Sequence, residues 1–299
     1  MKNEDIPKRV FAKAKDDAEV ARQSVSTPQT ADPAYKLAFQ DNDFLLREDL
    51  RPIRFQLELL KPELLLDEAK IGSTFVFYGS ARIPEPAKAD AIVAAAKTDT
   101  QRAIAERLAA KARYYDEARA LARLASEAPR DDEGQRHFVV CSGGGPSIME
   151  AANRGAADAG AESIGLNIVL PFEQAPNPYV TPSLSFQFHY FALRKMHFLL
   201  RARAVAVFPG GFGTFDETFE LLTLIQTGKM AALPILFYGR EFWTRVIDFD
   251  ALVEEGVIGP NDLELFHFVE SSAEGWEIVQ DFYRRNEHRP IRLGRPIGR

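Results

Sequence analysis

Two glycine-rich segments are the strongest candidates for chemistry in this sequence. The first is SGGGPSIME at residues 142–150, and the second is PGGFGTFDE at residues 209–217. Each follows a short apolar run and precedes a helical pattern. Glycine allows a close approach of the backbone to a ligand, and the free N–H groups of a helix start attract anions. The two segments therefore predict a site for a phosphorylated ligand.

Both segments also have a purely structural interpretation. Ser147-x-x-Glu150 and Thr214-x-x-Glu217 match the capping box, in which the two side chains close the start of their own helix. Pro146 suits the first helical position. Neither segment matches the dinucleotide fingerprint G-x-G-x-x-G or the P-loop pattern G-x-x-x-x-G-K-[ST]. Spacing alone leaves open whether Glu217 acts on a ligand or only caps its helix.

A basic run begins at Arg194 and Lys195 and continues with Arg201 and Arg203. One interpretation is a solvated helix face. In the other, Arg194 binds an anionic substrate, because the guanidinium fork suits phosphate and carboxylate. The sequence does not choose between these two roles.

The histidines and the cysteine are expected to be structural. His189 and His197 lie among aromatic residues, where a packed core histidine is commoner than a catalyst. Cys141 is the sole cysteine, so no intramolecular disulfide and no cysteine cluster for a metal can form. A reactive thiol needs a lowered pKa. We expect Cys141 instead to be a buried side chain that packs in the core.

Strands and helices alternate along most of the chain. The predicted strands are residues 73–78, 137–141, 163–170, 204–208, 233–238 and 265–269. The predicted helices are residues 87–125 (divided near Thr98), 147–159, 191–201, 214–227, 242–254 and 273–286. The alternation predicts an α/β fold: a Rossmann-like, doubly wound, mostly parallel sheet with helices on both faces.

Three predicted strands end in glycine, at Gly79, Gly143 and Gly210. In open parallel sheets, ligands bind outside the carboxyl ends of the strands. We therefore expect these three loops to meet in one crevice.

Composition divides the chain into four parts. Residues 1–35 are polar and are interpreted as a flexible N-terminal segment. Residues 36–70 carry apolar residues at helical spacing, broken at Pro52 and Pro62, and predict a helical extension packed on the main domain. Residues 71–288 form the predicted nucleotide-binding catalytic domain, with a helical insertion at about 86–112. Residues 289–299 form a basic tail.

The overall composition excludes several classes of protein. Of the 299 residues, 46% are hydrophobic and 27% are charged, which is typical of a globular chain. The net charge of −6 gives no global reason to bind a nucleic-acid backbone. No apolar run reaches the ~18 residues of a membrane span, and the N-terminus lacks a signal-peptide core. We expect a cytoplasmic protein with no nucleic-acid or membrane partner.

Four short motifs together resemble the LOG family of nucleoside 5′-monophosphate phosphoribohydrolases, long labelled lysine decarboxylases. PGGFGTFDE (209–217) matches its P-G-G-x-G-T-x-x-E signature, and GGGPSIMEAANRGA (143–156) is similar to its first glycine segment, with Ser147 where glycine is usual. FYGSAR (77–82) resembles its first strand and turn. Arg194-Lys195 resembles its R-K pair, although Met196-His197-Phe198 departs from the usual continuation. The resemblance covers about residues 73–250.

This resemblance implies hydrolysis of the N-glycosidic bond of a nucleoside 5′-monophosphate, AMP or an N6-modified AMP foremost, to free base and ribose 5-phosphate. It implies that Arg194 and Glu217 are the catalytic pair, with no metal and no cofactor, and that the enzyme is a homodimer or larger. The other residues expected to bind phosphate or substrate are Gly79, Ser80, Gly143, Gly144, Gly145, Met149, Glu150, Lys195, Gly210, Gly211, Gly213 and Thr214.

The sequence leaves three functions other than hydrolysis open. A lysine decarboxylase needs pyridoxal phosphate on a lysine, and Lys195 is the only lysine near the motifs. The same fold can also bind and sense a nucleotide without hydrolysing it. A scaffold role would act through the basic C-terminal end, which carries Arg284, Arg285, Arg289, Arg292, Arg295 and Arg299.

Overall fold

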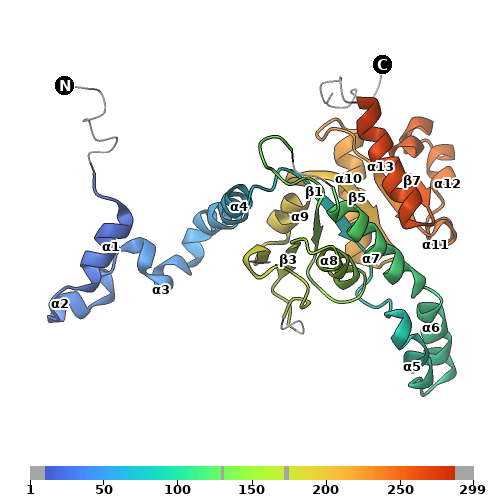
Figure 1. The fold of residues 1–299 in the computed structure, drawn as a ribbon. Coiled ribbons are helices and arrows are strands. Elements are labelled where there is room, and N and C mark those ends of the chain that lie inside the picture. The colour runs from blue at the N-terminus through green and yellow to red at the C-terminus, as the bar shows by residue number, and fades with distance from the viewer. Residues whose placement is uncertain (1–10, 129–130, 172–174, 287–299) are drawn as a thin grey trace. The chain divides into compact units, whose positions relative to one another are not determined.

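The computed structural model describes residues 11–128, 131–171 and 175–286. Its internal contacts divide the chain into two compact units, Met1–Glu58 and Leu59–Arg299. The boundary falls inside helix α4 (Arg51–Glu68), and Figure 1 labels helices and strands of each unit where there is room.

The first unit consists of short helices. These are α1 (Ala14–Arg22), α2 (Pro28–Ala31) and α3 (Asn42–Leu45), with single 3-10 turns at Pro33–Tyr35, Ala38–Gln40 and Glu48–Leu50. Of the described residues 11–58, only Ala18 is buried. Because hydrophobic burial is the main favourable term in folding, this part of the unit holds no core of its own.

The described part of the second unit contains a seven-stranded sheet with the order β4-β3-β2-β1-β5-β6-β7. Its strands are β1 (Thr74–Tyr78), β2 (Val139–Ser142), β3 (Ile164–Ile168), β4 (Ser185–Phe188), β5 (Ala202–Val207), β6 (Ile235–Tyr238) and β7 (His267–Val269). Every neighbouring pair is parallel. The predicted doubly wound, Rossmann-like fold is confirmed.

The strand order reverses between β1 and β5. The chain moves outward from β1 to β4 on one side, and then returns to add β5, β6 and β7 on the other. The register places Ser142 of β2 and Ala206 of β5 beside Phe77 of β1. The loops after these three strands therefore leave the sheet at the same edge, where a crevice is expected in such folds.

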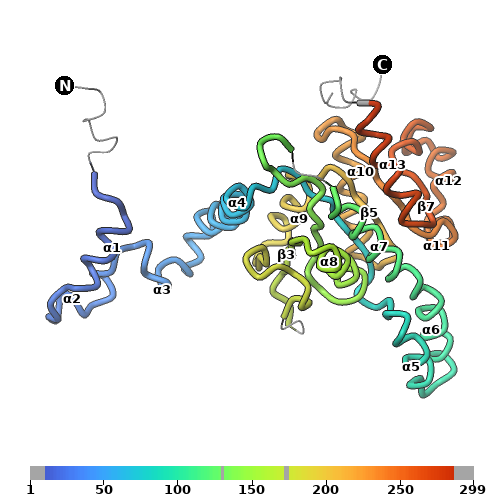
Figure 2. Tube along the Cα trace, viewed as in Figure 1, coloured from blue at the N-terminus to red at the C-terminus, as the bar shows by residue number. Residues whose placement is uncertain are grey.

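Successive residues of β1 face opposite sides of the sheet. Phe75 and Phe77 belong to the core beneath α7 (Arg113–Ser126), α8 (Ile148–Asp158) and α13 (Ser272–Asn286). Tyr78 packs edge-on against Phe198 of α9 (Phe191–Leu200) on the other face, at a centroid distance of 5.2 Å. Figure 2 traces these layers, with helices on both faces of the sheet.

Helices α7 and α8 pack closely because alanine and glycine line their contact. Ala118, Ala122, Ala151 and Ala156 are fully buried, and a Cβ on Gly155 would meet the backbone of Arg119. This contact fixes the helix that begins at the first glycine segment.

The structure corrects several predicted boundaries. Residues 87–125 contain three helices, α5 (Ala89–Ala94), α6 (Asp99–Ala109) and α7, rather than two. The predicted division near Thr98 is confirmed, because Thr98 is the N-cap of α6. The predicted helix 242–254 is divided into α11 (Arg240–Val246) and α12 (Phe249–Glu254). Strand β4 was not predicted. The remaining helix is α10 (Phe212–Gln226), and 3-10 turns lie at Pro86–Lys88, Pro182–Leu184 and Pro260–Leu265.

The basic C-terminal tail predicted at 289–299, with Arg289, Arg292, Arg295 and Arg299, lies outside the described residues. None of the helices in the described ranges has the length and apolar character needed to cross a bilayer.

Candidate active site

The structure brings Arg194 and Glu217 together at the carboxyl edge of the sheet. Arg194 lies on α9 and Glu217 on α10, and Arg194 Nη1 is 3.4 Å from Glu217 Oε1. Arg194 Nε also donates a hydrogen bond of 2.7 Å to the carbonyl of Leu166 in β3. The two side chains are only 12% and 14% exposed. They form a largely desolvated ion pair held by the sheet.

Burial raises the pKa of Glu217 to about 7, although Arg194 opposes that shift and the Asp216 carboxylate adds to it. Tyr78, at the end of β1, has a pKa well above its ordinary value because it is buried and feels the charge of Glu217. A carboxyl group that exchanges its proton near neutral pH suits general acid–base work.

Gly143 makes room for this pair. A Cβ at residue 143 would lie 2.6 Å from Arg194 Nη2 and 2.8 Å from Met149 Sδ. The first glycine segment, Met149 and the Arg194 guanidinium are therefore in direct contact. A side chain at position 143 would displace Arg194.

A buried polar network holds the first glycine loop. Asn177 Nδ2 donates to the carbonyl oxygens of Gly144 (3.1 Å) and Gly145 (3.0 Å) and to Asn153 Oδ1 (2.9 Å). Ser142 Oγ donates to the same Asn153 oxygen and accepts from the Gly144 N–H. Gly144 has a φ of +72° with the Asn167 side chain pressed against it, so this position requires glycine. The network fixes the path of the loop.

The predicted capping box at residues 147–150 is not formed. Helix α8 begins at Ile148, so Pro146 is not its first residue, and the Ser147 side chain does not cap it. Ser147 Oγ instead donates to the carbonyl of Ile83, and Glu150 accepts a hydrogen bond of 3.1 Å from Tyr115. Ser147 has a φ of +67°, a conformation that favours glycine.

The second predicted capping box is excluded in the same way. Helix α10 begins at Phe212 with Gly211 as its N-cap and has no side-chain cap. Thr214 is therefore inside the helix and buried, so it does not cap the helix, and the structural interpretation that the spacing had left open is excluded. Gly211 and Gly213 have open space where a Cβ would be. The N-termini of α8 and α10, both within the described residues, are left without a side-chain cap.

The loop after β1 joins the two glycine loops. The Ser80 N–H donates to the carbonyl of Pro209 (3.1 Å), and the Ile148 N–H donates to the carbonyl of Ser80 (3.4 Å). Gly79 lies directly against the Ile148 side chain, and Gly210 against Thr214. The three loops predicted to converge do so in the structure.

Lys195 follows Arg194 on α9, but its ammonium group binds two carboxylates of α10. Its Nζ is 3.0 Å from Asp216 Oδ1 and 3.1 Å from Glu220 Oε2. Burial alone would lower the pKa of Lys195, but the hydrogen bonds to Asp216 and Glu220 outweigh it and raise the pKa. The amine therefore stays protonated and links α9 to α10.

The other basic and titratable residues are structural. Arg201 binds the Glu63 and Asp67 carboxylates of α4 rather than a ligand. His197 is buried against the Phe188 ring, as expected for a core histidine. Burial raises the pKa of Cys141, so its thiol is not activated. Within the described ranges, no group of three His, Cys, Asp or Glu is placed to hold a metal.

Two features of the site were missed in the sequence. Tyr78 is the last residue of a strand that reads as core, and Asn177 lies in the proline-rich stretch after β3. Loops as long as the one that carries Asn177 are often functional, and that length is a signal that could have pointed to it. The hydrogen bonds from Asn177 to the glycine carbonyl oxygens leave no recognisable pattern in the sequence.

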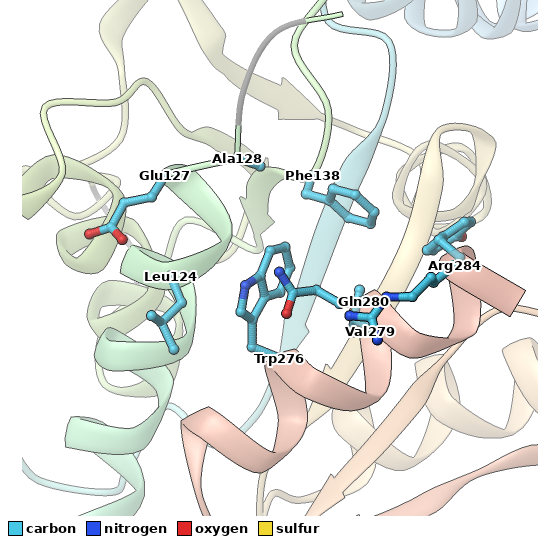
Figure 3. Close-up of a pocket in the computed structure, with 9 residues that line it drawn as sticks. Leu124, Glu127, Ala128, Phe138, Trp276, Val279, Gln280 and Arg284 are labelled. Atoms are coloured by element: carbon cyan, nitrogen blue, oxygen red, sulfur yellow. The ribbon is translucent and has the colours of Figure 1, made fainter. Parts of the chain in front are cut away.

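A separate pocket of about 450 Å³ lies between α7 and α13. Figure 3 shows Trp276 and Phe138 facing each other there, with Leu124 on α7 and Arg284 on α13. Phe138 precedes β2, so this pocket lies toward the amino ends of the strands. None of the predicted site residues lines it.

One comparison with known proteins, the match to a family model, agrees with the motifs. Residues 149–279 match the model of a family described as "Possible lysine decarboxylase". No curated protein matches the chain. Similar solved structures include the X-ray structure of TM1055 (19% identity, TM-score 0.45, 70% of this chain and 99% of that one) and the Moco carrier protein from Chlamydomonas reinhardtii (16% identity, TM-score 0.42, 71% and 99%). The family match confirms the resemblance to the LOG family.

Proposed function

We propose that this LOG-family chain hydrolyses the N-glycosidic bond of a nucleoside 5′-monophosphate, with AMP or an N6-modified AMP as the leading substrate. The observation that carries the proposal is the buried Arg194–Glu217 pair, whose carboxyl group has a pKa of about 7. It lies beside two uncapped helix N-termini at the carboxyl edge of a parallel sheet.

Glu217 supplies the charge that this reaction needs. As the C1′–N bond breaks, its electron pair leaves with the base and positive charge develops on the ribose. The Glu217 carboxylate stabilises that charge and takes a proton from the water whose oxygen bonds to C1′. The proton then passes to the departing base, and the products are free base and ribose 5-phosphate.

Arg194 holds the carboxylate in place. Its hydrogen bond to the Leu166 carbonyl and its contact with Phe198, at 5.0 Å from the ring centroid, fix the guanidinium. Arg194 also opposes the rise in the pKa of Glu217. In the proposed reaction it keeps a useful fraction of Glu217 ionised near neutral pH.

The glycine loops supply the phosphate anchor. Uncapped first turns present N–H groups and the positive end of the helix dipole, which together attract a phosphate. The open space over Gly211 and Gly213 lets the phosphate approach the start of α10. Binding energy from the phosphate then positions C1′ beside Glu217.

Lysine decarboxylation is not favoured by the site, despite the description of the matching family. A Schiff base requires a neutral amine, whereas the pKa of Lys195 is raised and the amine binds two carboxylates. An absorbance scan of the purified protein with added pyridoxal phosphate tests this directly. A lysine-dependent Schiff-base band would contradict the preference.

A matched pair of variants tests the proposed hydrolysis. We expect Glu217→Gln to reduce release of adenine from AMP at least about 100-fold while AMP still binds, because a general base is lost. Glu220→Gln, one helical turn along α10, is the control and keeps most of the activity. Unchanged turnover in Glu217→Gln would overturn the catalytic assignment.

We also propose that the chain forms a homodimer or larger assembly. Large apolar side chains are exposed on α9 and α10, including Phe191, Met196, Leu200 and Phe219. Exposed apolar clusters of this kind mark association surfaces.

A further inference from the structure

A second pocket lies against the Gly210–Gly211 loop and is not lined by Arg194 or Glu217. It has a volume of about 280 Å³ and is bounded by the loop after β1, by α6, and by Phe242 of α11. Helix α6 precedes the part of the chain that the family model matches. None of the residues in the pocket that come from α6 was predicted to be functional.

The floor of this pocket is apolar. Ile83, Leu108 and Phe242 line it, together with Ile104 of α6, which is 54% exposed. An isoleucine this exposed, beside a buried Ile83, leaves apolar surface that a ligand can cover.

Three cations, Arg82, Arg107 and Lys111, stand around this floor. Throughout residues 11–128, 131–171 and 175–286, no carboxylate forms an ion pair with them. Two other cations of this region do form ion pairs, since Lys88 pairs with Glu85 and Arg113 with Glu270. The pocket therefore gathers three positive charges that no carboxylate in the described ranges neutralises by an ion pair.

The environment of Lys111 shows the same excess of positive charge. Burial lowers the pKa of Lys111, and Arg245 and Arg107 lower it further, with only Glu241 opposing them. Lys111 Nζ donates to the Arg107 carbonyl at 2.9 Å, which caps the end of α6. That single bond leaves further N–H donors of the ammonium for a ligand.

We propose that this pocket binds an amphipathic organic anion. An aromatic or aliphatic body covers the floor of Ile83, Ile104, Leu108 and Phe242, and a phosphate or carboxylate binds Arg82, Arg107 and Lys111. The inference does not depend on the proposed hydrolysis. Because Ser80 and Gly210–Gly211 line the pocket as well, an occupant contacts the loops that border the candidate active site.

Calorimetric titration of the full chain with 1-naphthyl phosphate tests the proposal. Inorganic phosphate supplies the anion alone, and 1-naphthol supplies the apolar body alone. We expect 1-naphthyl phosphate to bind at least about 10-fold more tightly than either, because each part adds its own contacts. Naphthoic acid in a further arm distinguishes a carboxylate from a phosphate as the preferred anion.

Variants assign the binding to the pocket. Arg107→Ala and Lys111→Ala should each weaken 1-naphthyl phosphate about 10-fold, as expected for loss of a charged hydrogen bond. Ile104→Asn should weaken it through the floor. Arg102→Ala is the matched control, since Arg102 is exposed on α6 but does not line the pocket.

Several results would overturn the inference. These are absence of binding at millimolar probe, equal weakening by Arg102→Ala, or unchanged affinity in Arg107→Ala, Lys111→Ala and Ile104→Asn alike. The last result would place the probe elsewhere on the protein. Because this readout is binding, it stays distinct from any failure of AMP hydrolysis.

Discussion

The ionisation of Glu217 joins the structure to the proposed chemistry at the scale of single residues. Desolvation favours the neutral acid, and Arg194 favours the carboxylate. A pKa of about 7 means that the group changes charge in the range where the enzyme would work. Neighbouring charges on α9 and α10 then tune activity against pH.

The pH dependence of kcat/KM for AMP should rise with pH through a midpoint near 7, because the active form carries ionised Glu217. Asp216→Asn removes a charge that raises the pKa of Glu217, so this midpoint should move to lower pH. Lys195→Met removes a charge that lowers that pKa, so the midpoint should move to higher pH. Identical profiles in all three proteins would show that Glu217 does not set the acidic limb.

Gly143→Ala tests the contact between the first glycine loop and Arg194. The new Cβ would lie 2.6 Å from Arg194 Nη2, the end of a flexible side chain, so the protein should fold with Arg194 displaced. We expect kcat for AMP to fall at least about 10-fold, as loss of a positioned group costs more than ~1.4 kcal/mol.

Gly213→Ala provides the contrast to Gly143→Ala, because its Cβ meets open space. It should raise KM through the phosphate and leave kcat nearly unchanged. Thermal melts of both variants check folding. Equal kcat in Gly143→Ala and the wild type would remove the proposed role of this contact.

At the residue scale, the pairing of Arg194 with Glu217 was implied by the resemblance to the LOG family, and the structure brings the two side chains together. Their catalytic roles stay a prediction. The capping role of Thr214 was wrong, because α10 starts at Phe212, two residues before it. The partners of Lys195 and the buried position of Tyr78 depend on side-chain packing, which spacing does not reveal.

At the scale of elements, the site depends on a loop that no glycine motif marks. Asn177 holds the carbonyl groups of two of the three glycines from outside the segment. Backbone oxygens that lose such a donor while buried are costly. The shape of the first glycine loop is therefore set by residues 177 and 153 as much as by its own glycines.

Asn177→Ala should loosen the first glycine loop without touching the Arg194–Glu217 pair. We expect a loss of about 1–3 kcal/mol in the free energy of unfolding, since buried acceptors lose their donor. KM for AMP should rise more than kcat falls. Gln187→Ala, on an exposed position of β4, serves as the control. A drop in kcat alone, with KM and stability intact, would contradict this positioning role.

Element prediction succeeded where strands are short, apolar and buried on both sides, as in β5 and β6. It failed for β4, whose Ser185 and Gln187 alternate with aromatic residues in a stretch that follows several prolines. Residues 242–254 read as one helix, but Asp248 caps a new helix there. Aspartate favours the N-cap position, but the sequence alone does not show whether an N-cap residue inside an amphipathic run divides the helix.

At the scale of the whole molecule, the proposed assembly depends on the large apolar side chains that helices α9 and α10 expose. This exposure favours an assembly in which apolar surface is covered by protein. That residues 36–70 pack on the main domain stays a prediction.

Light scattering coupled to size-exclusion chromatography should give at least twice the mass of one chain. Phe219→Arg or Leu200→Arg should shift the protein toward monomer, because a charge would be buried in an apolar contact. Val257→Arg, at an exposed position after α12, is the control and should keep the assembly. A monomeric wild type, or an assembly unaffected by both variants, would contradict this surface.

The most direct measurement is a product assay with pure protein. AMP, an N6-modified AMP, GMP, CMP and UMP are incubated separately, each beside its nucleoside, and free base is followed by chromatography. We expect release of base from at least one monophosphate, with AMP or its N6-modified form foremost, and none from the matching nucleoside. Binding of these nucleotides with no base released from any of them would contradict hydrolysis and favour a nucleotide-sensing protein.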